Sequence, residues 1–391
     1  MEYDRVIHGR IVDPVTGVQE AYIGINGGII RKVSGKELRS PDITTILQDH
    51  YIFPAFIDPH VHLREPGWEH KEDFLTGSEA ALNGGVHTVL DMPNLPEPVT
   101  TPERLLKKIT LSRKAKVDVR HFAGIGKLDL IRENARLAIG YKIYTAKSTG
   151  GMMLDWENAE KACRLIAATG KPVTFHCEDE MLFTQNEFHG DARPPESEVS
   201  AIVKAADLIR KTHINGNIAH VSTKEGLAAA REHQLMHEIT PHHLYFNRES
   251  AAGPLFKVNP PLRSRADNAA LLDSVRHGEC MLATDHAPHT IAEKLSSNPP
   301  SGMPGLDTYG NFVLWLLRAK YVSPSAVAKI TSYNASKFFS IAGGRIAEGF
   351  PAKFTVLGTE GESIIRNADM KTKCGWTPFD GVTFPGKIIR L

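Results

Sequence analysis

The feature that most constrains the fold is an alternation of short, apolar, β-branched runs with longer segments of helical periodicity. This alternation predicts strand–helix units around a parallel sheet whose strands are buried on both faces. Eight runs are present, at residues 51–58, 86–91, 117–123, 141–145, 172–176, 217–220, 237–240 and 281–284. Eight such units over roughly 250 residues predict an α/β fold of the TIM (β/α)8 barrel type, with functional groups at the carboxyl ends of the strands.

The two ends of the chain lie outside these eight units. Residues 1–50 contain short β-like runs and Gly-containing turns, and residues 343–391 have the same character. Because chain termini usually lie close together at a domain surface, both ends are expected to form one small β-domain. The predicted division is therefore 1–50 and 343–391 for the small β-domain and 51–342 for the barrel.

Charge and cysteine usage exclude several classes of partner. The 46 Lys+Arg and 45 Asp+Glu residues give a net charge of +1, so no global field attracts nucleic acid or an anionic membrane. The four scattered cysteines contain no CxxC pair, which excludes a disulfide scaffold and favours a reducing compartment. No apolar run approaches the ~18 residues that span a bilayer, and the first residues lack a secretory signal. We therefore expect a cytoplasmic protein with neither a nucleic-acid nor a membrane partner.

Histidines gather at the ends of the predicted strands. His60 and His62 are two residues apart, a spacing that in a strand lets both side chains reach one metal ion. An isolated pair of this kind can equally pack or form hydrogen bonds. His176, His220 and Asp285, however, lie at the ends of three other predicted strands. Together they predict a metal site, because these buried polar groups would otherwise be left unsatisfied.

Lys142 lies on the fourth predicted strand and would point into the same cavity. Burial favours the neutral amine, which can add CO2 and become an anionic carbamate, although a strand lysine is more commonly an exposed charge. Such a carbamate can bridge two metals. The two metals would activate a water molecule and polarise a carbonyl, which favours hydrolysis of an amide-like bond. Asp285 would then act as general acid/base, taking a proton from the water and passing it to the leaving nitrogen.

Several motifs identify a family. They are Asp-Pro-His-Val-His-Leu-Arg-Glu-Pro-Gly at 58–67, Asp-Met-Pro-Asn at 91–94, Thr-Pro-His-His-Leu at 240–244, Asn-Pro-Pro-Leu-Arg at 259–263, Thr-Asp-His-Ala-Pro-His-Thr at 284–290 and Pro-Gly-Leu at 304–306. In sequence and in order they resemble the motifs of dihydroorotases in the amidohydrolase superfamily. The resemblance covers residues from about 50 to 340. It implies reversible hydrolysis of L-dihydroorotate to N-carbamoyl-L-aspartate, a step of pyrimidine synthesis.

The resemblance also implies a ligand set. One Zn2+ would be held by His60, His62 and Asp285, a second by His176 and His220, and a carboxylated Lys142 would bridge the two. Some members of the family place an aspartate a few residues further on instead, but Lys147 lies in that stretch and no acid does, so the lysine-carboxylating type is favoured. Zinc, cobalt and manganese all accept such ligands, so the native metal stays open.

A substrate clamp is implied as well. The resemblance assigns the carboxylate of dihydroorotate to Arg64, Asn94 and Asn259, with His289 nearby on the pyrimidine side. Arginine offers a planar, two-pronged donor suited to a carboxylate. The motifs of allantoinases and dihydropyrimidinases lack this arginine, so Arg64 favours dihydroorotase activity over those two alternatives. A third alternative is a catalytically silent barrel that serves as a scaffold for another pyrimidine enzyme, although no ligand of the set is missing.

Other residues receive simpler interpretations. Cys177, Glu178 and Glu238 could support the metal ligands or bind a further metal, but packing or a solvated acid is the expected role, and a structural role is expected for His242 and His243. Segment 290–303 is either a mobile lid or a plain long loop. His189 is among the histidines without any motif context. The sequence does not fix the oligomeric state: a homodimer and an association with aspartate transcarbamoylase both stay open, and the expected substrate is a small molecule.

Overall fold

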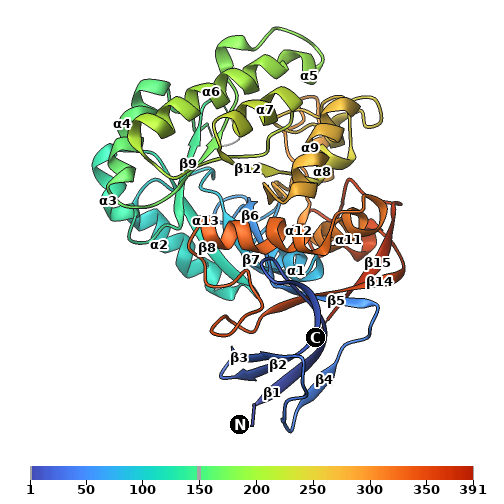
Figure 1. The fold of residues 1–391 in the computed structure, drawn as a ribbon. Helices are drawn as coiled ribbons and strands as arrows, with labels where there is room; N and C mark the ends of the chain where they lie inside the picture. Colours follow the sequence, from blue (N-terminus) through green and yellow to red (C-terminus); the bar gives the residue numbers. More distant parts are fainter. Residues whose placement is uncertain (1, 148–150, 391) are drawn as a thin grey trace.

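The computed structural model describes residues 2–147 and 151–390, which form two sheets and the helices around them (Figure 1). One sheet has eight parallel strands in the order β13-β12-β11-β10-β9-β8-β7-β6 and curls into a nearly closed barrel. Its strands are β6 (Phe56–Val61), β7 (Val86–Asp91), β8 (Asp118–Gly124), β9 (Gly140–Tyr144), β10 (Val173–His176), β11 (Gly216–Ile218), β12 (Met236–Ile239) and β13 (Met281–Leu282). The predicted (β/α)8 barrel is thereby confirmed.

Helices follow the strands along the chain and surround the barrel (Figure 1). The longer ones are α1 (Phe74–Asn83), α2 (Pro102–Leu111), α4 (Trp156–Ala167), α6 (Pro195–Thr212), α7 (Lys224–Glu232), α9 (Arg265–His277) and α11 (Tyr309–Ala319). The shorter ones are α3 (Ile131–Asn134), α5 (His189–Ala192), α8 (Pro241–Tyr245), α10 (Ile291–Lys294), α12 (Pro324–Ala328) and α13 (Asn334–Phe338). None of the helices in the described ranges is long and apolar enough to cross a membrane.

Local sequence fixes where the helices begin and end. Asp155 and Thr223 are the N-caps of α4 and α7, and their side chains accept hydrogen bonds from backbone N–H groups of the first helical turns. Gly278 ends α9 with φ 69°, a left-handed conformation that glycine adopts without a steric cost. The two N-caps follow the carboxyl ends of β9 and β11 at the barrel mouth, where the candidate site lies, whereas Gly278 precedes β13 at the opposite end of the barrel.

The barrel closes between its first and last strands through a side chain. Asp58 of β6 accepts hydrogen bonds from the backbone N–H and the hydroxyl of Thr284, just beyond β13. Further along, the His62 N–H donates to the His286 carbonyl at 2.8 Å, and Val61 and His286 form a parallel bridge. The Asp58 carboxylate thus links β6 to the chain just beyond β13, which has only two residues. This closure brings the chain after β13 beside the histidines of β6.

The second sheet unites the two ends of the chain, as predicted. Its seven strands are β1 (Arg5–Asp13), β2 (Gly17–Asn26), β3 (Ile29–Ser34), β4 (Ile43–Thr45), β5 (His50–Pro54), β14 (Phe354–Ile364) and β15 (Thr383–Ile389). The C-terminal pair joins the N-terminal strands because β14 runs antiparallel to β5. The N-terminal strands project from the barrel in Figure 1. The domain limits at 50 and 342 stay a prediction.

One expected strand differs from the structure. The run at 51–58 is expected to be a single barrel strand, but it divides at Ala55 into β5 and β6. Residues of β5 pair with β14 in the terminal sheet, whereas β6 pairs with β7 in the barrel. A run that is apolar throughout fits both sheets, so its composition does not reveal the change of partner.

Candidate metal centre and substrate site

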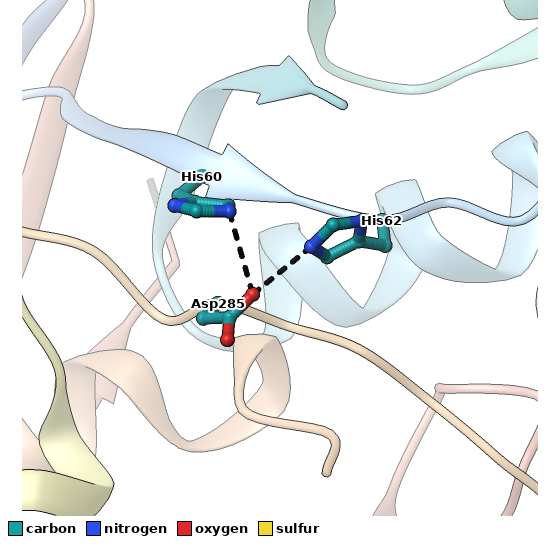
Figure 2. Close-up of side chains that lie close together, drawn as sticks. All are labelled: His60, His62 and Asp285. Carbon is teal, nitrogen blue, oxygen red and sulfur yellow. Dashed lines mark hydrogen bonds and ion pairs between the residues drawn. The ribbon is translucent and has the colours of Figure 1, made fainter. Parts of the chain in front are cut away.

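The two histidines of β6 face a carboxylate across the barrel mouth. His60 Nε2 lies 3.5 Å from Asp285 Oδ1, and His62 Nε2 lies 3.0 Å from the same oxygen (Figure 2). All three residues are buried, and their ligand atoms lie within 4.8 Å of one another. The structure therefore brings together the three residues to which the sequence analysis assigns the first metal.

Each of these rings is oriented by a partner on its other nitrogen. His60 Nδ1 lies 2.7 Å from Glu238 Oε2, and His62 Nδ1 lies 2.7 Å from Asn94 Oδ1. Because both partners are oxygen acceptors, both Nδ1 atoms donate and both Nε2 lone pairs face Asp285. The electron-rich Nε2 and carboxylate atoms would repel each other unless a proton or a cation lay between them.

Burial disfavours the proton. It lowers the pKa of His62 to about 4. Although burial opposes the effect, the interactions of Asp285 with His60 and His62 keep its pKa well below the usual value, so the carboxylate stays ionised. Two imidazole nitrogens and a carboxylate that converge in this way fit a divalent metal ion of the kind that the resemblance implies.

A second cluster lies at the ends of the next strands. His176 ends β10 and His220 follows β11, and His176 Nδ1 lies 3.0 Å from His220 Nε2. Burial lowers the pKa of His176 and lowers that of His220 well below its usual value. Glu178 Oε2 lies 2.8 Å from His176 Nε2, which leaves Nδ1 free to act as a ligand. The pair therefore also fits a metal.

Lys142 lies between the two clusters. Its side chain is 1% exposed, and its Nζ is 3.5 Å from His60 Nε2. Burial lowers the pKa of Lys142 to about 8, so the neutral amine is far more populated near neutral pH than in an exposed lysine. An amine in this state is the form that reacts with CO2.

Strained backbone marks the mouth of the barrel. Arg64, His220 and Asp285 have φ angles of 62°, 35° and 48°, in the left-handed region that residues with a Cβ rarely occupy. Such conformations cost on the order of 1–3 kcal/mol each and persist where the surroundings enforce them. All three are candidate site residues, so the strain coincides with the site.

The four clamp residues lie close to this centre. Arg64 is 2% exposed, its Nε donates to the Pro288 carbonyl at 3.1 Å, and its Nη2 is 3.2 Å from His289 Nε2. Asn259 Oδ1 accepts from His189 Nε2 at 2.8 Å. One cavity is bordered by both clusters and by three of the clamp residues; its lining comprises His60, His62, Arg64, Asn94, Tyr144, His176, His220, Asn259, Asp285, Ala287, Ser301 and Gly302. His289 borders the cavity indirectly, through Arg64.

Sequence reasoning missed several neighbours of these residues. The interpretation of Glu178 and Glu238 as solvated acids is wrong, because both are fully buried and orient His176 and His60. His189 holds Asn259 although no motif marks it. The position of Glu178, two residues after His176, was a usable signal, because alternate residues of an extended chain share a face.

The structure gives structural roles to other residues for which the sequence analysis expected packing or a structural role. Cys177 packs in the hydrophobic core. His243 bonds to the Thr240 hydroxyl and to the Pro260 carbonyl, which positions the loop that carries Asn259. His242 is buried beside it.

Hydrogen bonds from a buried lysine anchor segment 290–303. Its buried Lys294 ammonium donates to the carbonyls of Lys257, Pro300 and Gly302 at 3.0, 3.0 and 2.8 Å. Because Ser301 and Gly302 line the cavity, these bonds hold one of its walls in place.

A buried ion pair supports the segment that bears the first metal's ligands. Asp91 Oδ2 lies 2.8 Å from Lys108 Nζ, both side chains are fully buried, and Asp91 Oδ1 accepts from the Leu63 N–H, between His62 and Arg64. Lys108→Met should lower the free energy of unfolding by about 3–5 kcal/mol, because Asp91 would remain as an unpaired buried charge. Urea denaturation measures the change. Lys161→Met, in the exposed pair with Glu157, is the control and should leave stability nearly unchanged; equal stability of the two variants would contradict the prediction.

Comparison with known proteins agrees with this geometry. The sequence pattern of the Amidohydrolase family matches residues 51–391. A dihydroorotase of Methanosarcina acetivorans is 34% identical over 403 residues, covering 93% of this chain and 85% of the relative. A dihydroorotase of Pyrococcus abyssi is 33% identical, with 98% and 90% covered. Among solved structures, an L-hydantoinase (dihydropyrimidinase) from Arthrobacter aurescens superimposes with a TM-score of 0.93 at 23% identity, covering 99% of this chain and 94% of the other. That last similarity shows the fold alone.

Proposed function

The chain belongs to the amidohydrolase family, and from this premise we propose that it is a dihydroorotase, which interconverts L-dihydroorotate and N-carbamoyl-L-aspartate in pyrimidine synthesis. It is a hydrolase of a metal-dependent family and carries a buried His–His–Asp cluster. The observation that carries the choice of substrate is Arg64, a buried guanidinium on the same cavity as that cluster. A buried cation calls for an anionic partner, and the ring carboxylate of dihydroorotate supplies one.

The residues present suit two zinc ions. We assign one to His60, His62 and Asp285 and the other to His176 and His220, with a carboxylated Lys142 between them. Support comes from the neutral, inward-facing imidazoles and from the buried Lys142 amine. Bound zinc would lower the pKa of a water molecule and polarise the substrate carbonyl.

The chain's own residues carry the remaining steps. Arg64, Asn94 and Asn259 bind the ring carboxylate. His289 holds Arg64 in position through the contact between His289 Nε2 and Arg64 Nη2. Asp285, which is ionised, takes a proton from the attacking water. It then delivers that proton to the ring nitrogen as the C–N bond breaks. The reverse sequence closes the ring.

The direct test is hydrolysis of L-dihydroorotate, followed by ultraviolet absorbance with the zinc-supplemented protein. Allantoin and dihydrouracil are run in parallel, because each offers a cyclic amide without the ring carboxylate. Selective turnover of dihydroorotate is expected. Turnover of a neutral ring instead would refute the substrate assignment, and a protein that binds no transition metal and opens no ring would favour the scaffold alternative.

Carboxylation of Lys142 makes reconstitution depend on CO2. After removal of metal by a chelator, zinc alone in CO2-depleted buffer should restore little activity, whereas zinc with bicarbonate should restore it fully. A carbamate signal in ¹³C NMR after addition of labelled bicarbonate is the second readout. Lys142→Arg should lose both responses, because a guanidinium does not add CO2.

The matched control for this experiment is Lys147→Arg, because that lysine is 79% exposed on the loop after β9. It should behave like the wild type in both readouts. Full recovery of the wild type without bicarbonate, and without a carbamate signal, would contradict carboxylation. Homodimer formation, association with aspartate transcarbamoylase and a cytoplasmic location stay predictions.

A further inference from the structure

The hydroxyl of Tyr144 is a buried polar group without a partner at the candidate site. The residue is 4% exposed, and its oxygen has no hydrogen-bond partner within residues 2–147 and 151–390. Tyr144 lines the same cavity as Arg64, Asn259 and Asp285. We propose, on the basis of the proposed function, that this hydroxyl is a further catalytic group, which donates a hydrogen bond to the carbonyl oxygen of the amide being hydrolysed.

The strand sets the position of this side chain. Tyr144 ends β9 two residues after Lys142, so both side chains leave the strand on the inner face of the barrel, with Tyr144 one layer nearer the mouth. Its ring centroid is 5.9 Å from that of His176, and Lys142 Nζ is 5.4 Å from the Tyr144 ring centroid. The ring is therefore packed beside the residues assigned to the hydrolytic centre.

Asp285, Arg64 and Asp91 are the charged groups that influence the Tyr144 hydroxyl, and the first two border the cavity. A phenol, whose ordinary pKa is about 10, keeps its proton near neutral pH and can donate a hydrogen bond. A buried donor left unsatisfied costs about 1–3 kcal/mol, and a substrate oxygen that accepts its hydrogen bond would remove that cost.

The water oxygen forms a bond to the amide carbon, and the carbonyl π pair moves onto the carbonyl oxygen, where the Tyr144 O–H donates a hydrogen bond and keeps its proton. When the carbonyl re-forms, the C–N bond breaks and its electron pair leaves on nitrogen. The nitrogen takes the proton that Asp285 removed from the water. Because negative charge grows on the oxygen during this step, the hydrogen bond is stronger in the transition state than in the ground state.

Tyr144→Phe tests the proposal, and Tyr141→Phe is the matched control. Tyr141 lies on the same strand with its side chain on the opposite face, where its hydroxyl bonds to the Ile131 carbonyl. Tyr144→Phe should lower kcat on the order of 100-fold, as loss of one oxyanion donor does, with unchanged zinc content. KM should change by less than about threefold, because the bond strengthens only in the transition state. Tyr141→Phe should lower Tm and leave kcat near the wild-type value.

The outcomes separate this inference from the proposed function. Both variants are assayed on whichever cyclic amide the wild type opens, because all such rings share the amide oxygen. Turnover of dihydrouracil rather than dihydroorotate, with a large kcat loss in Tyr144→Phe, would refute the substrate assignment and support the role of Tyr144. Unchanged kcat in Tyr144→Phe, or a rise in KM alone, would overturn the proposal, as would equal kcat losses in both variants.

Discussion

Asp285→Asn is expected to reduce kcat for dihydroorotate by about 10³-fold or more, because general acid–base catalysis alone contributes 10²–10⁴-fold and the carboxylate is also an assigned metal ligand. The asparagine amide keeps the shape of the side chain but neither takes up a proton nor carries the charge that faces His60 and His62. Steady-state kinetics beside zinc analysis of the same sample measure the two losses separately.

Asp273→Asn provides the control for this substitution. Asp273 is half-exposed and pairs with Arg231 on the surface, so its variant should retain wild-type kinetics and zinc content. Near-wild-type turnover of Asp285→Asn with unchanged zinc would contradict both roles assigned to Asp285. A loss of zinc that excess metal reverses, together with recovery of turnover, would assign Asp285 to ligation and remove it from proton transfer.

The barrel and the convergence of its candidate ligands are predictable from sequence because both depend on local spacing. Alternating strand and helix periods specify the (β/α)8 order, and parallel strands deliver their carboxyl ends to one mouth. The candidate ligands His60, His62, His176, His220 and Asp285 could therefore be grouped although they are far apart in the sequence. The geometry of the two clusters then follows from the register of neighbouring strands.

What the sequence did not reveal depends on burial and on contacts between distant loops. In the sequence nothing distinguishes Glu238 from other charged residues, but in the fold β12 places its Oε2 2.7 Å from His60 Nδ1. His189 contacts Asn259 from a separate part of the chain. The free hydroxyl of Tyr144 is likewise a property of its surroundings, because a tyrosine in a strand usually finds a partner. The division of residues 51–58 at Ala55 depends on β14, about 300 positions later, which no local pattern encodes.

Arg64→Ala should change the choice of substrate. We expect kcat/KM for dihydroorotate to fall about 10³-fold, equivalent to about 4 kcal/mol at 1.36 kcal/mol per factor of ten. The variant removes the charge that faces the ring carboxylate and leaves the carboxylate desolvated without its cation. Turnover of dihydrouracil, which lacks that carboxylate, should change by less than about tenfold, so the ratio of the two substrates measures the clamp.

Arg64→Lys separates charge from geometry at the same position. The ammonium retains the positive charge but neither the two-pronged donor nor the bond from Arg64 Nε to the Pro288 carbonyl. Its loss on dihydroorotate should therefore lie between those of the wild type and Arg64→Ala, and this order follows only if Arg64 binds the carboxylate directly. Equal losses on dihydroorotate and dihydrouracil in both variants would show instead that Arg64 stabilises the left-handed backbone turn after His62. The choice of substrate would then have to be reassigned to other residues of the cavity.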